Sequence, residues 1–394
     1  MTELRVAQIV TTLARGGAQA TVLSSRGMDD RGVAVTVLAG TDDTGEGTHW
    51  PDLDEAGGPV VAVPPLRRSI RPADDARALR WLTGWLRRHR PDVVHTHSTK
   101  AGVLGRLAAR RVGIPVVHTV HGWGEAADGG ARTPAVPRLL RSVERALAPA
   151  AHALVVVTPL DAGVGLDRGI GRPDQYRVIR SGVDLAPSRR AFADRAVIRQ
   201  ELDLGDRFVV GTVARLARQK DLSTLLAGFA AAGIDDGVLL VVGDGPLRDA
   251  LQAEARALGL GAAVRWLGAR PDGARLVAAF DAFALTSRWE GLPRALVEAQ
   301  AARVPVVATP VGGVGELVEH ERTGLVVPVG CPDAVAGALT EVAADPAGAA
   351  RRAVAAAAAL EPFEMERMRS DLAALWWEAA DRAPSPRPPS VRPG

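Results

Sequence analysis

The chain has 394 residues, too many for one ordinary core and enough for two domains of about 150–200 residues. Hydrophobic residues make up 47% and charged residues 24%, proportions that exclude a disordered or collagen-like protein. Lys and Arg number 48 against 45 Asp and Glu, and they alternate along the chain, so no nucleic-acid partner is expected.

In the amino-terminal half, short β-branched runs alternate with longer Ala, Leu and Arg segments of helical period. The pattern predicts strands at 4–10, 33–38, 92–95, 115–120 and 153–157, and helices at 18–29, 74–88, 101–111 and 137–147. Near-continuous apolar strands separated by helices indicate a parallel sheet that is covered on both faces.

After a polar, Arg-rich stretch at 180–195 the same alternation starts again. Strands are predicted at 208–213, 238–242, 264–267, 282–285, 304–308 and 325–327, and helices at 222–232, 247–258, 274–280, 294–302 and 333–343. The fold class is therefore α/β, with two doubly wound Rossmann-like domains at 1–183 and 184–364. Ligands of such domains bind outside the carboxyl ends of the strands, here in a central cleft. A last helix at 365–380 precedes a Pro-rich tail at 383–394, which we expect to be disordered.

The most informative stretch runs from Ser287 to Glu298, between a predicted strand and a predicted helix. Pro293 suits a first helical turn, so the backbone amides before it are free to bind an anion. Glu290 in the loop and Glu298 about one turn inside the helix flank these amides. Carboxylates accept hydrogen bonds from a vicinal diol, and amides suit phosphate or sugar oxygens. A plain acidic helix start with a solvated Glu is the alternative.

This stretch has the pattern S-x-x-E-G-x-P-x-x-x-x-E-A and is followed by PVVATPVGG at 305–313 and by Gly315-Glu316. It resembles the signature of the retaining family 4 glycosyltransferases, whose two-Rossmann-domain fold is called GT-B. The resemblance covers nearly the whole chain apart from the tail. Other matching segments are GGA at 16–18, VHTHSTKAG at 94–102, HTVHG at 118–122, SGVD at 181–184, VARLARQKD at 213–221 and VGDGP at 242–246.

The resemblance implies an enzyme that moves a sugar from a nucleoside diphosphate sugar to an acceptor hydroxyl without a metal or other cofactor. Glu298 would hold the ribose hydroxyls and Glu290 the hydroxyls of the donor sugar. The amides of Gly291 and Leu292 would bind the sugar and the phosphates. The last helix is expected to pack back on the amino-terminal domain.

Arg215 and Lys220 follow a predicted strand and precede a predicted helix whose expected cap is Asp221. Two cations five positions apart can neutralise a diphosphate leaving group without a metal. Lys220 and Lys100 are the chain's two lysines, so a Lys at 220 is unexpected from composition and indicates a site that needs a compact charge. Two ordinary surface cations are the alternative.

Glycines mark two further strand ends. Gly16 and Gly17 follow the first strand, where a ligand can approach the backbone at a helix end. By resemblance, the loop at Gly243 lies along the nucleotide, and the segment ending at Arg270 lies near its base. Ordinary strand-to-helix turns are the alternative. The chain has no G-x-G-x-x-G fingerprint, which disfavours a dinucleotide oxidoreductase.

Four histidines cluster in the amino-terminal half: His95, His97, His118 and His121. Their spacing and the lack of nearby carboxylates argue against a metal site. By resemblance, His121 touches the donor sugar near the reacting centre, and a buried packing histidine is the alternative. His97, Ser98 and Lys100 precede a helix on the same rim and are candidates for acceptor or phosphate contacts.

Three other features bear on the function. Asp52-Leu-Asp54 has the pattern of a metal-dependent transferase, but its setting predicts a loop. Arg303 stands where the family has a small residue, and the segment 319–321 replaces a Gly-containing turn, which leaves the local turns in doubt. The Arg-rich helix at 138–147 can rest on an anionic membrane surface, although a solvated helix is the alternative.

The single cysteine, Cys331, excludes internal disulfides and Cys-based zinc sites, which favours a reducing compartment. The sequence shows no signal-peptide pattern and no apolar stretch of roughly 18–20 residues. We therefore expect a cytoplasmic enzyme, at or near the inner face of the membrane if its acceptor is lipid-linked.

The sequence thus predicts a retaining glycosyltransferase whose amino-terminal domain binds the acceptor, a sugar, polysaccharide or lipid-linked sugar of the cell envelope. Its carboxyl-terminal domain binds the nucleotide-sugar donor, and closure of the cleft expels water. The resemblance implies that retention follows from same-face attack, assisted by a donor phosphate oxygen, and no residue here has the profile of an obvious covalent nucleophile. A nucleotide-sugar epimerase of the same architecture and a non-catalytic nucleotide-sugar-binding protein are the alternatives.

Overall fold

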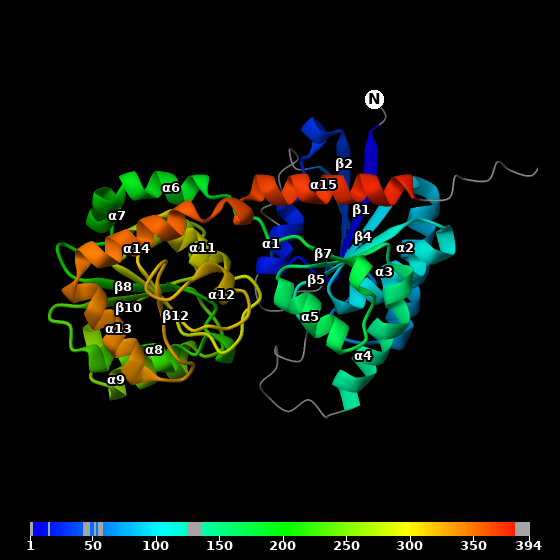
Figure 1. The fold of residues 1–394 in the computed structure, drawn as a ribbon. Coiled ribbons are helices and arrows are strands. Elements are labelled where there is room, and N and C mark those ends of the chain that lie inside the picture. The colour runs from blue at the N-terminus through cyan, green and yellow to red at the C-terminus, as the bar shows by residue number, and fades with distance from the viewer. Residues whose placement is uncertain are drawn as a thin grey trace, which may run out of the picture.

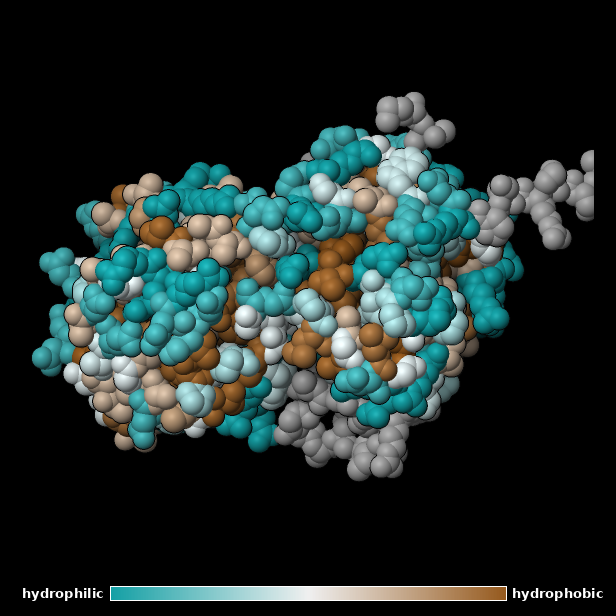
Figure 2. Space-filling model, in the orientation of Figure 1, coloured by the Kyte–Doolittle hydropathy of each residue, from teal (hydrophilic) through white to brown (hydrophobic). Residues whose placement is uncertain are grey.

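A computed structural model describes residues 3–14, 16–41, 48–50, 53, 58–123 and 135–382 of the chain. These residues form two lobes, each built on one parallel sheet with helices on both faces (Figure 1). Figure 2 shows that one face of the molecule is mostly hydrophilic, with hydrophobic patches toward the boundary between the lobes. The predicted fold class is confirmed.

The first sheet has seven strands in the order β3-β2-β1-β4-β5-β6-β7. They are β1 (Leu4–Val10), β2 (Val33–Ala39), β3 (Val60–Ala62), β4 (Val93–His97), β5 (Val116–Val120), β6 (Ala153–Val156) and β7 (Tyr176–Val178). The strand order reverses between β1 and β4. A crevice opens outside the carboxyl ends of the strands at such a switch point.

Helices cover both faces of this sheet: α1 (Gly17–Ser24), α2 (Pro72–His89), α3 (Thr99–Val112), α4 (Ala135–Leu147) and α5 (Pro159–Asp167). Successive side chains of a strand point to opposite faces, so β1 supplies two separate cores. Ala7 and Ile9 pack with residues of α2 and α3, and Val6 and Val10 pack with residues of the last helix of the chain.

The second sheet repeats the same order with six strands, β10-β9-β8-β11-β12-β13. They are β8 (Val209–Val213), β9 (Val238–Val242), β10 (Val264–Gly268), β11 (Ala282–Leu285), β12 (Val306–Ala308) and β13 (Leu325–Val326). The helices are α6 (Ala186–Ala193), α7 (Arg195–Glu201), α8 (Leu222–Ala232), α9 (Arg248–Ala257), α10 (Gly273–Leu276), α11 (Arg294–Ala301), α12 (Val314–Leu317), α13 (Pro332–Ala344) and α14 (Pro346–Ala358).

The last helix, α15 (Met365–Asp381), leaves the second lobe and lies across the first (Figure 1). Its Met368, Leu372 and Trp376 are buried in the same core as β1, and Trp376 is fully buried. At the crossing, the Val183 amide donates to the Phe363 carbonyl at 2.9 Å, and the Met365 amide donates to the Val183 carbonyl at 3.0 Å. The chain passes between the lobes twice, near Val183 and near Phe363–Met365, and these two segments therefore lie side by side. The domain boundary at 183 stays a prediction.

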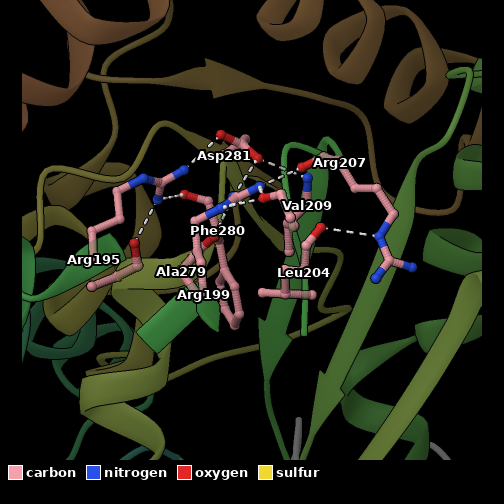
Figure 3. Close-up of polar contacts among 10 residues, drawn as sticks. Arg195, Arg199, Leu204, Arg207, Val209, Ala279, Phe280 and Asp281 are labelled. Carbon is pink, nitrogen blue, oxygen red and sulfur yellow. Dashed lines mark hydrogen bonds and ion pairs between the residues drawn. The ribbon is translucent and has the colours of Figure 1, made fainter. Parts of the chain in front are cut away.

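An arginine cluster ties α7 to the amino-terminal edge of the second sheet, as Figure 3 shows. Arg195 and Arg199 donate to the two carboxylate oxygens of Asp281 at 2.7 and 3.1 Å, and the Val209 amide donates to the same carboxylate at 2.8 Å. The two guanidinium groups also donate to the carbonyls of residues 278–280. Asp281 thus holds α7, β8 and β11 together at the edge opposite the carboxyl ends of the strands.

Several elements differ from the predicted ones. The polar, Arg-rich segment at 180–195, for which no element was predicted, contains α6, and α7 begins at its end. The strands β3 and β7 and the helices α5 and α14 were not predicted. The predicted helix 18–29 ends at Ser24, ahead of Gly27, whose φ is +59°. The predicted helix 274–280 is α10 followed by a 3-10 turn.

Candidate active site

Loops from the two lobes approach one another at the carboxyl ends of the strands. A Cβ built on Gly17 would lie 3.7 Å from Arg294 Cδ, and one on Gly291 would lie 3.4 Å from the His121 carbonyl oxygen. Arg294 also donates to the Gly182 carbonyl at 2.8 Å. Segments of the predicted motifs therefore meet at the boundary between the lobes.

The structure brings Lys220 and Glu290 into direct contact. The Lys220 ammonium donates to Glu290 Oε1 at 2.5 Å, and the Ser287 hydroxyl donates to the same oxygen at 2.6 Å. Gln219 donates to Oε2 at 3.4 Å. The Glu290 side chain is only 5% exposed. Its carboxylate is thus held by three donors, while the ammonium of Lys220 stays at the edge of the cleft.

Arg215 is exposed just beyond β8, in a loop whose course is set by Gly243 and Gly245. Gly243 has φ +135°, and a Cβ there would lie 1.9 Å from the Ala214 carbonyl oxygen. A Cβ on Gly245 would lie 2.5 Å from the Leu216 carbonyl oxygen. A side chain at either position would therefore push away the backbone that carries Arg215.

The loop before α11 is shaped by close backbone packing. Gly312, with φ +52°, lies so close to Glu290 that a Cβ on it would be 1.9 Å from the Glu290 carbonyl oxygen. The Gly313 amide donates to the Gly291 carbonyl at 2.8 Å. Among the described residues, neither the Gly291 nor the Leu292 amide donates a hydrogen bond. These two amides lie at the start of α11, where an anion is favoured.

Glu298 lies one turn inside α11, beside Arg294. Burial raises the pKa of the Glu298 carboxyl, and the positive charge of Arg294 offsets part of that rise. Burial also lowers the pKa of Arg294. The opposite charges of Glu298 and Arg294 attract one another, and both groups are largely withdrawn from water. A carboxylate at this position can accept hydrogen bonds from ligand hydroxyls.

In the first lobe, His97 lies between Gln8 and His121. His97 Nε2 is 2.8 Å from Gln8 Oε1, and His97 Nδ1 is 3.1 Å from His121 Nε2. Burial lowers the pKa of His121 to about 4 and the pKa of His97 well below its usual value. Neighbouring Ser98 has φ +63° and shares a 2.6 Å hydrogen bond with Thr11. Gly16 and Gly17 are exposed at the end of β1.

Two residues that were predicted to contact ligands, Lys100 and Arg270, bind partners within the protein. Lys100 pairs with Asp75 of α2 and donates to the Ser69 carbonyl at 2.5 Å. Arg270 pairs with Asp272 at 2.7 Å on the exposed surface. Their positive charges are already partnered in this structure, and their roles toward acceptor and base stay predictions.

Some residues of the site were not found from the sequence. Gln8 is a polar residue within the buried run LRVAQIV of β1, which is the signal that could have identified it. Ser287 and Gln219 lie within motifs that the sequence identified, but no role was assigned to either from the sequence. Asp52 and Asp54 lie outside the described residues. Within the part of the chain that the structure describes, no three His, Cys, Asp or Glu side chains are grouped as metal ligands.

Comparison with known proteins agrees with this geometry. Family models match as a glycosyl transferase 4-like domain over residues 4–182 and as glycosyl transferases group 1 over residues 194–360. The chain is 33% identical, over 72% of its length and 74% of the relative's, to UDP-Gal:alpha-D-GlcNAc-diphosphoundecaprenol alpha-1,3-galactosyltransferase of Escherichia coli. It is 31% identical to D-inositol 3-phosphate glycosyltransferase of Actinosynnema mirum, over 75% of each chain.

The solved structures include HepE of Anabaena in complex with UDP and glucose, with a TM-score of 0.82 and 23% identity over 95% of this chain and all of that one. The fold and the cleft thus define a GT-B protein. The chain belongs to the family 4 glycosyltransferases, enzymes that transfer a sugar from a nucleotide sugar to an acceptor. The comparisons support neither an epimerase nor a non-catalytic binding protein.

Proposed function

We propose that this enzyme transfers a sugar from a nucleoside diphosphate sugar with retention of configuration and without a metal, to a polysaccharide or lipid-linked acceptor of the cell envelope. The contact between Lys220 and Glu290 carries the proposal. It supplies a compact cation for the diphosphate and a fixed carboxylate for the sugar in one place. Arg215 and the amides of Gly291 and Leu292 add further positive potential for the leaving group.

The state of Glu290 supports same-face attack. Its carboxylate accepts from Lys220, Ser287 and Gln219, which makes it a poor nucleophile. In the proposed step the bond from the anomeric carbon to the phosphate oxygen breaks. The acceptor oxygen bonds to the anomeric carbon on the same face, and its proton passes to the departing phosphate. Glu298 would hold the ribose hydroxyls throughout.

The acceptor is proposed from the E. coli relative, whose name specifies a sugar linked to diphosphoundecaprenol. In the described residues, no helix is long and apolar enough to cross a membrane. Contact with a lipid-linked acceptor at the inner face of the membrane would then be peripheral. In this proposal the Arg-rich helix α4 of the first lobe meets the anionic lipid surface. Sedimentation with vesicles of anionic against neutral lipids tests this part.

The donor and the stereochemistry are tested together. The purified protein is titrated with UDP-, GDP- and ADP-sugars by calorimetry, with and without EDTA, and the anomeric configuration of the product is read by NMR. We expect binding of one nucleotide class, unchanged activity in EDTA and a retained configuration. An inverted product, or activity lost in EDTA and restored by Mg²⁺, would contradict the proposal.

A further inference from the structure

A row of polar side chains crosses the first sheet beneath the cleft. Gln8 lies on β1, His97 ends β4, and His121 directly follows β5. Within the sheet, Gln8 lies opposite His95, and His97 lies opposite Thr119. Gln8, His97 and Thr119 are buried, and they share the face that the core residues of α15 cover.

The direction of each hydrogen bond in this row can be derived from its inner end. The Ser25 hydroxyl donates its single proton to the Val22 carbonyl at 2.7 Å. Ser25 therefore accepts from Gln8, whose Nε2 lies 2.7 Å away. This fixes the orientation of the Gln8 amide and directs its Oε1 at His97 Nε2. Because an amide oxygen accepts, His97 must carry its proton on Nε2.

A neutral His97 with a proton on Nε2 has an unprotonated Nδ1, which can only accept. The group facing that atom is His121 Nε2, at 3.1 Å. His121 must then donate from Nε2, and its own Nδ1 is left with a lone pair. We propose that Gln8 and His97 are positioning residues that hold His121 in this tautomer, so that Nδ1 accepts a hydrogen bond from a sugar hydroxyl.

The surroundings keep the row neutral. His95, whose ring centroid is 4.2 Å from that of His97, accepts from the Trp376 indole at Nδ1 and so donates from Nε2 to Thr119. His118 pairs with the Thr96 hydroxyl. Among the described residues, no carboxylate bonds to any of these histidines. A protonated His97 would donate from Nδ1 as well, which would turn His121 to the Nδ1–H form and leave a buried positive charge without a bonded carboxylate among the described residues.

The tautomer itself is tested without any substrate. In protein labelled with ¹⁵N-histidine, long-range ¹H–¹⁵N spectra at pH 7 distinguish the two neutral forms, and loss of the signals in His121→Ala assigns them. We expect the Nε2–H form for both His97 and His121. An Nδ1–H form of His121, or a protonated ring, would overturn the proposal.

Kinetics test the consequence, which rests on the proposed placement of the donor sugar at His121. His97→Phe removes the acceptor at Nδ1, whereas His97→Asn restores an oxygen close to that position. We expect kcat to fall at least tenfold in His97→Phe and to recover largely in His97→Asn, with unchanged affinity for the free nucleoside diphosphate. His118→Asn, which alters a buried histidine–hydroxyl pair outside the row, is the matched control and should keep kcat.

If His97→Phe does not fold, Gln8→Glu provides the second test. A carboxylate at position 8 favours a protonated His97, whose Nδ1 then donates and forces His121 to the Nδ1–H form. We expect that switch in the spectra together with a lower kcat. Unchanged kcat in His97→Phe, or a switched tautomer with full activity, would overturn the positioning role. Absence of any nucleotide binding would instead contradict the proposed function and leave the tautomer result standing.

Discussion

In the proposed function, the charge of Lys220 acts on the leaving group. Its side chain is 17% exposed, and its ammonium contacts Glu290. Removing one preorganised donor from a developing charge typically lowers kcat by about 10²–10³. We expect a loss of that size in Lys220→Ala, measured by steady-state kinetics with the best donor.

Two variants make the Lys220 result specific. Lys220→Arg keeps the charge but replaces a compact ammonium with a planar fork, so we expect incomplete rescue. Arg367→Ala removes an exposed cation of α15 that pairs with Glu361 and Asp371 and should keep full activity. Equal activity of Lys220→Ala and Arg367→Ala would show that Lys220 has no part in transfer.

The backbone conformation of Glu321 should lower the stability of the protein. Its φ is +64°, and its side chain is exposed. A left-handed conformation costs a non-glycine residue about 1–2 kcal/mol, and glycine avoids this cost. Glycine is also more flexible in the unfolded chain, which offsets about 0.5–1 kcal/mol of the gain. Glu321→Gly should therefore raise the free energy of unfolding by about 0.5–1 kcal/mol in urea titrations.

The control for this gain is Glu321→Ala, which removes the carboxylate but keeps the Cβ. It should leave the stability of the protein close to that of the parent. A similar gain in both variants would mean that the charge of Glu321, and not its backbone, is unfavourable.

Some residues of the site could be predicted from residue type and spacing, whereas others depend on how the strands pair. Glu290 and Lys220 were selected by residue type and spacing, and the structure places them in contact. The departures at Arg303 and in the segment 319–321 were recognised as unusual, and Arg303 and Glu321 both have positive φ. The row through Gln8 could not be derived, because it depends on the register of three strands that are far apart in sequence.

At the scale of elements, buried strands with continuous apolar runs were predicted well. The bounds of β1, β9 and β11 agree with the sequence pattern. Edge strands β3 and β7 have three residues each, too few to show a period. Helix α7 was not predicted. It begins at the last residue of the polar, Arg-rich stretch, and its two arginines bind Asp281, a contact with a residue far away in sequence.

The cluster around Asp281 is an element-scale test of stability without activity. Its carboxylate joins Arg195, Arg199 and the Val209 amide at the edge of the sheet away from the cleft (Figure 3). Hydrogen bonds to charged groups contribute about 1.5–3 kcal/mol each, and their loss is not additive. We expect Asp281→Ala to lower the free energy of unfolding by about 3 kcal/mol.

The same variant should keep kcat under conditions where it remains folded, since the cleft lies at the opposite edge of the second sheet. Asp272→Ala, which removes an exposed partner of Arg270, offers a matched loss of one carboxylate with little effect on stability. If Asp281→Ala unfolds at the same urea concentration as the parent, the cluster is not a stabilising element.

At the scale of the whole molecule, α15 links the two lobes to the histidine row. The helix begins at Met365, whose amide donates to the Val183 carbonyl. Near its other end, the Trp376 indole donates to His95 Nδ1 at 3.2 Å. The last helix of the chain thus completes the core beneath the cleft of the first lobe. Burial strongly lowers the pKa values of four histidines, and all four lie in the first lobe: His95, His97, His118 and His121. The two lobes should therefore respond differently to acid.

Acid should destabilise the first lobe before the second. Burial lowers the pKa of His95 to about 3 and that of His121 to about 4, and it lowers those of His97 and His118 well below the usual value of 6.5. Below pH 6.5 the unfolded chain binds protons that the folded lobe does not. Stability is thus complete above that pH and is lost as the pH falls toward 4.

Each histidine then costs about 1.4 kcal/mol of stability per pH unit between pH 6 and 5. Burial raises the pKa values of Asp161 in the first lobe and Glu298 in the second, and both groups act in the opposite direction, but the four histidines outnumber them. Urea unfolding at pH 7, 6 and 5, combined with hydrogen exchange of each lobe, measures the effect. We expect the midpoint of the first lobe to fall steeply and that of the second to change little. A first lobe equally stable at pH 7 and 5 would mean that its histidines are protonated in the folded state, which would also contradict the neutral row that orients His121.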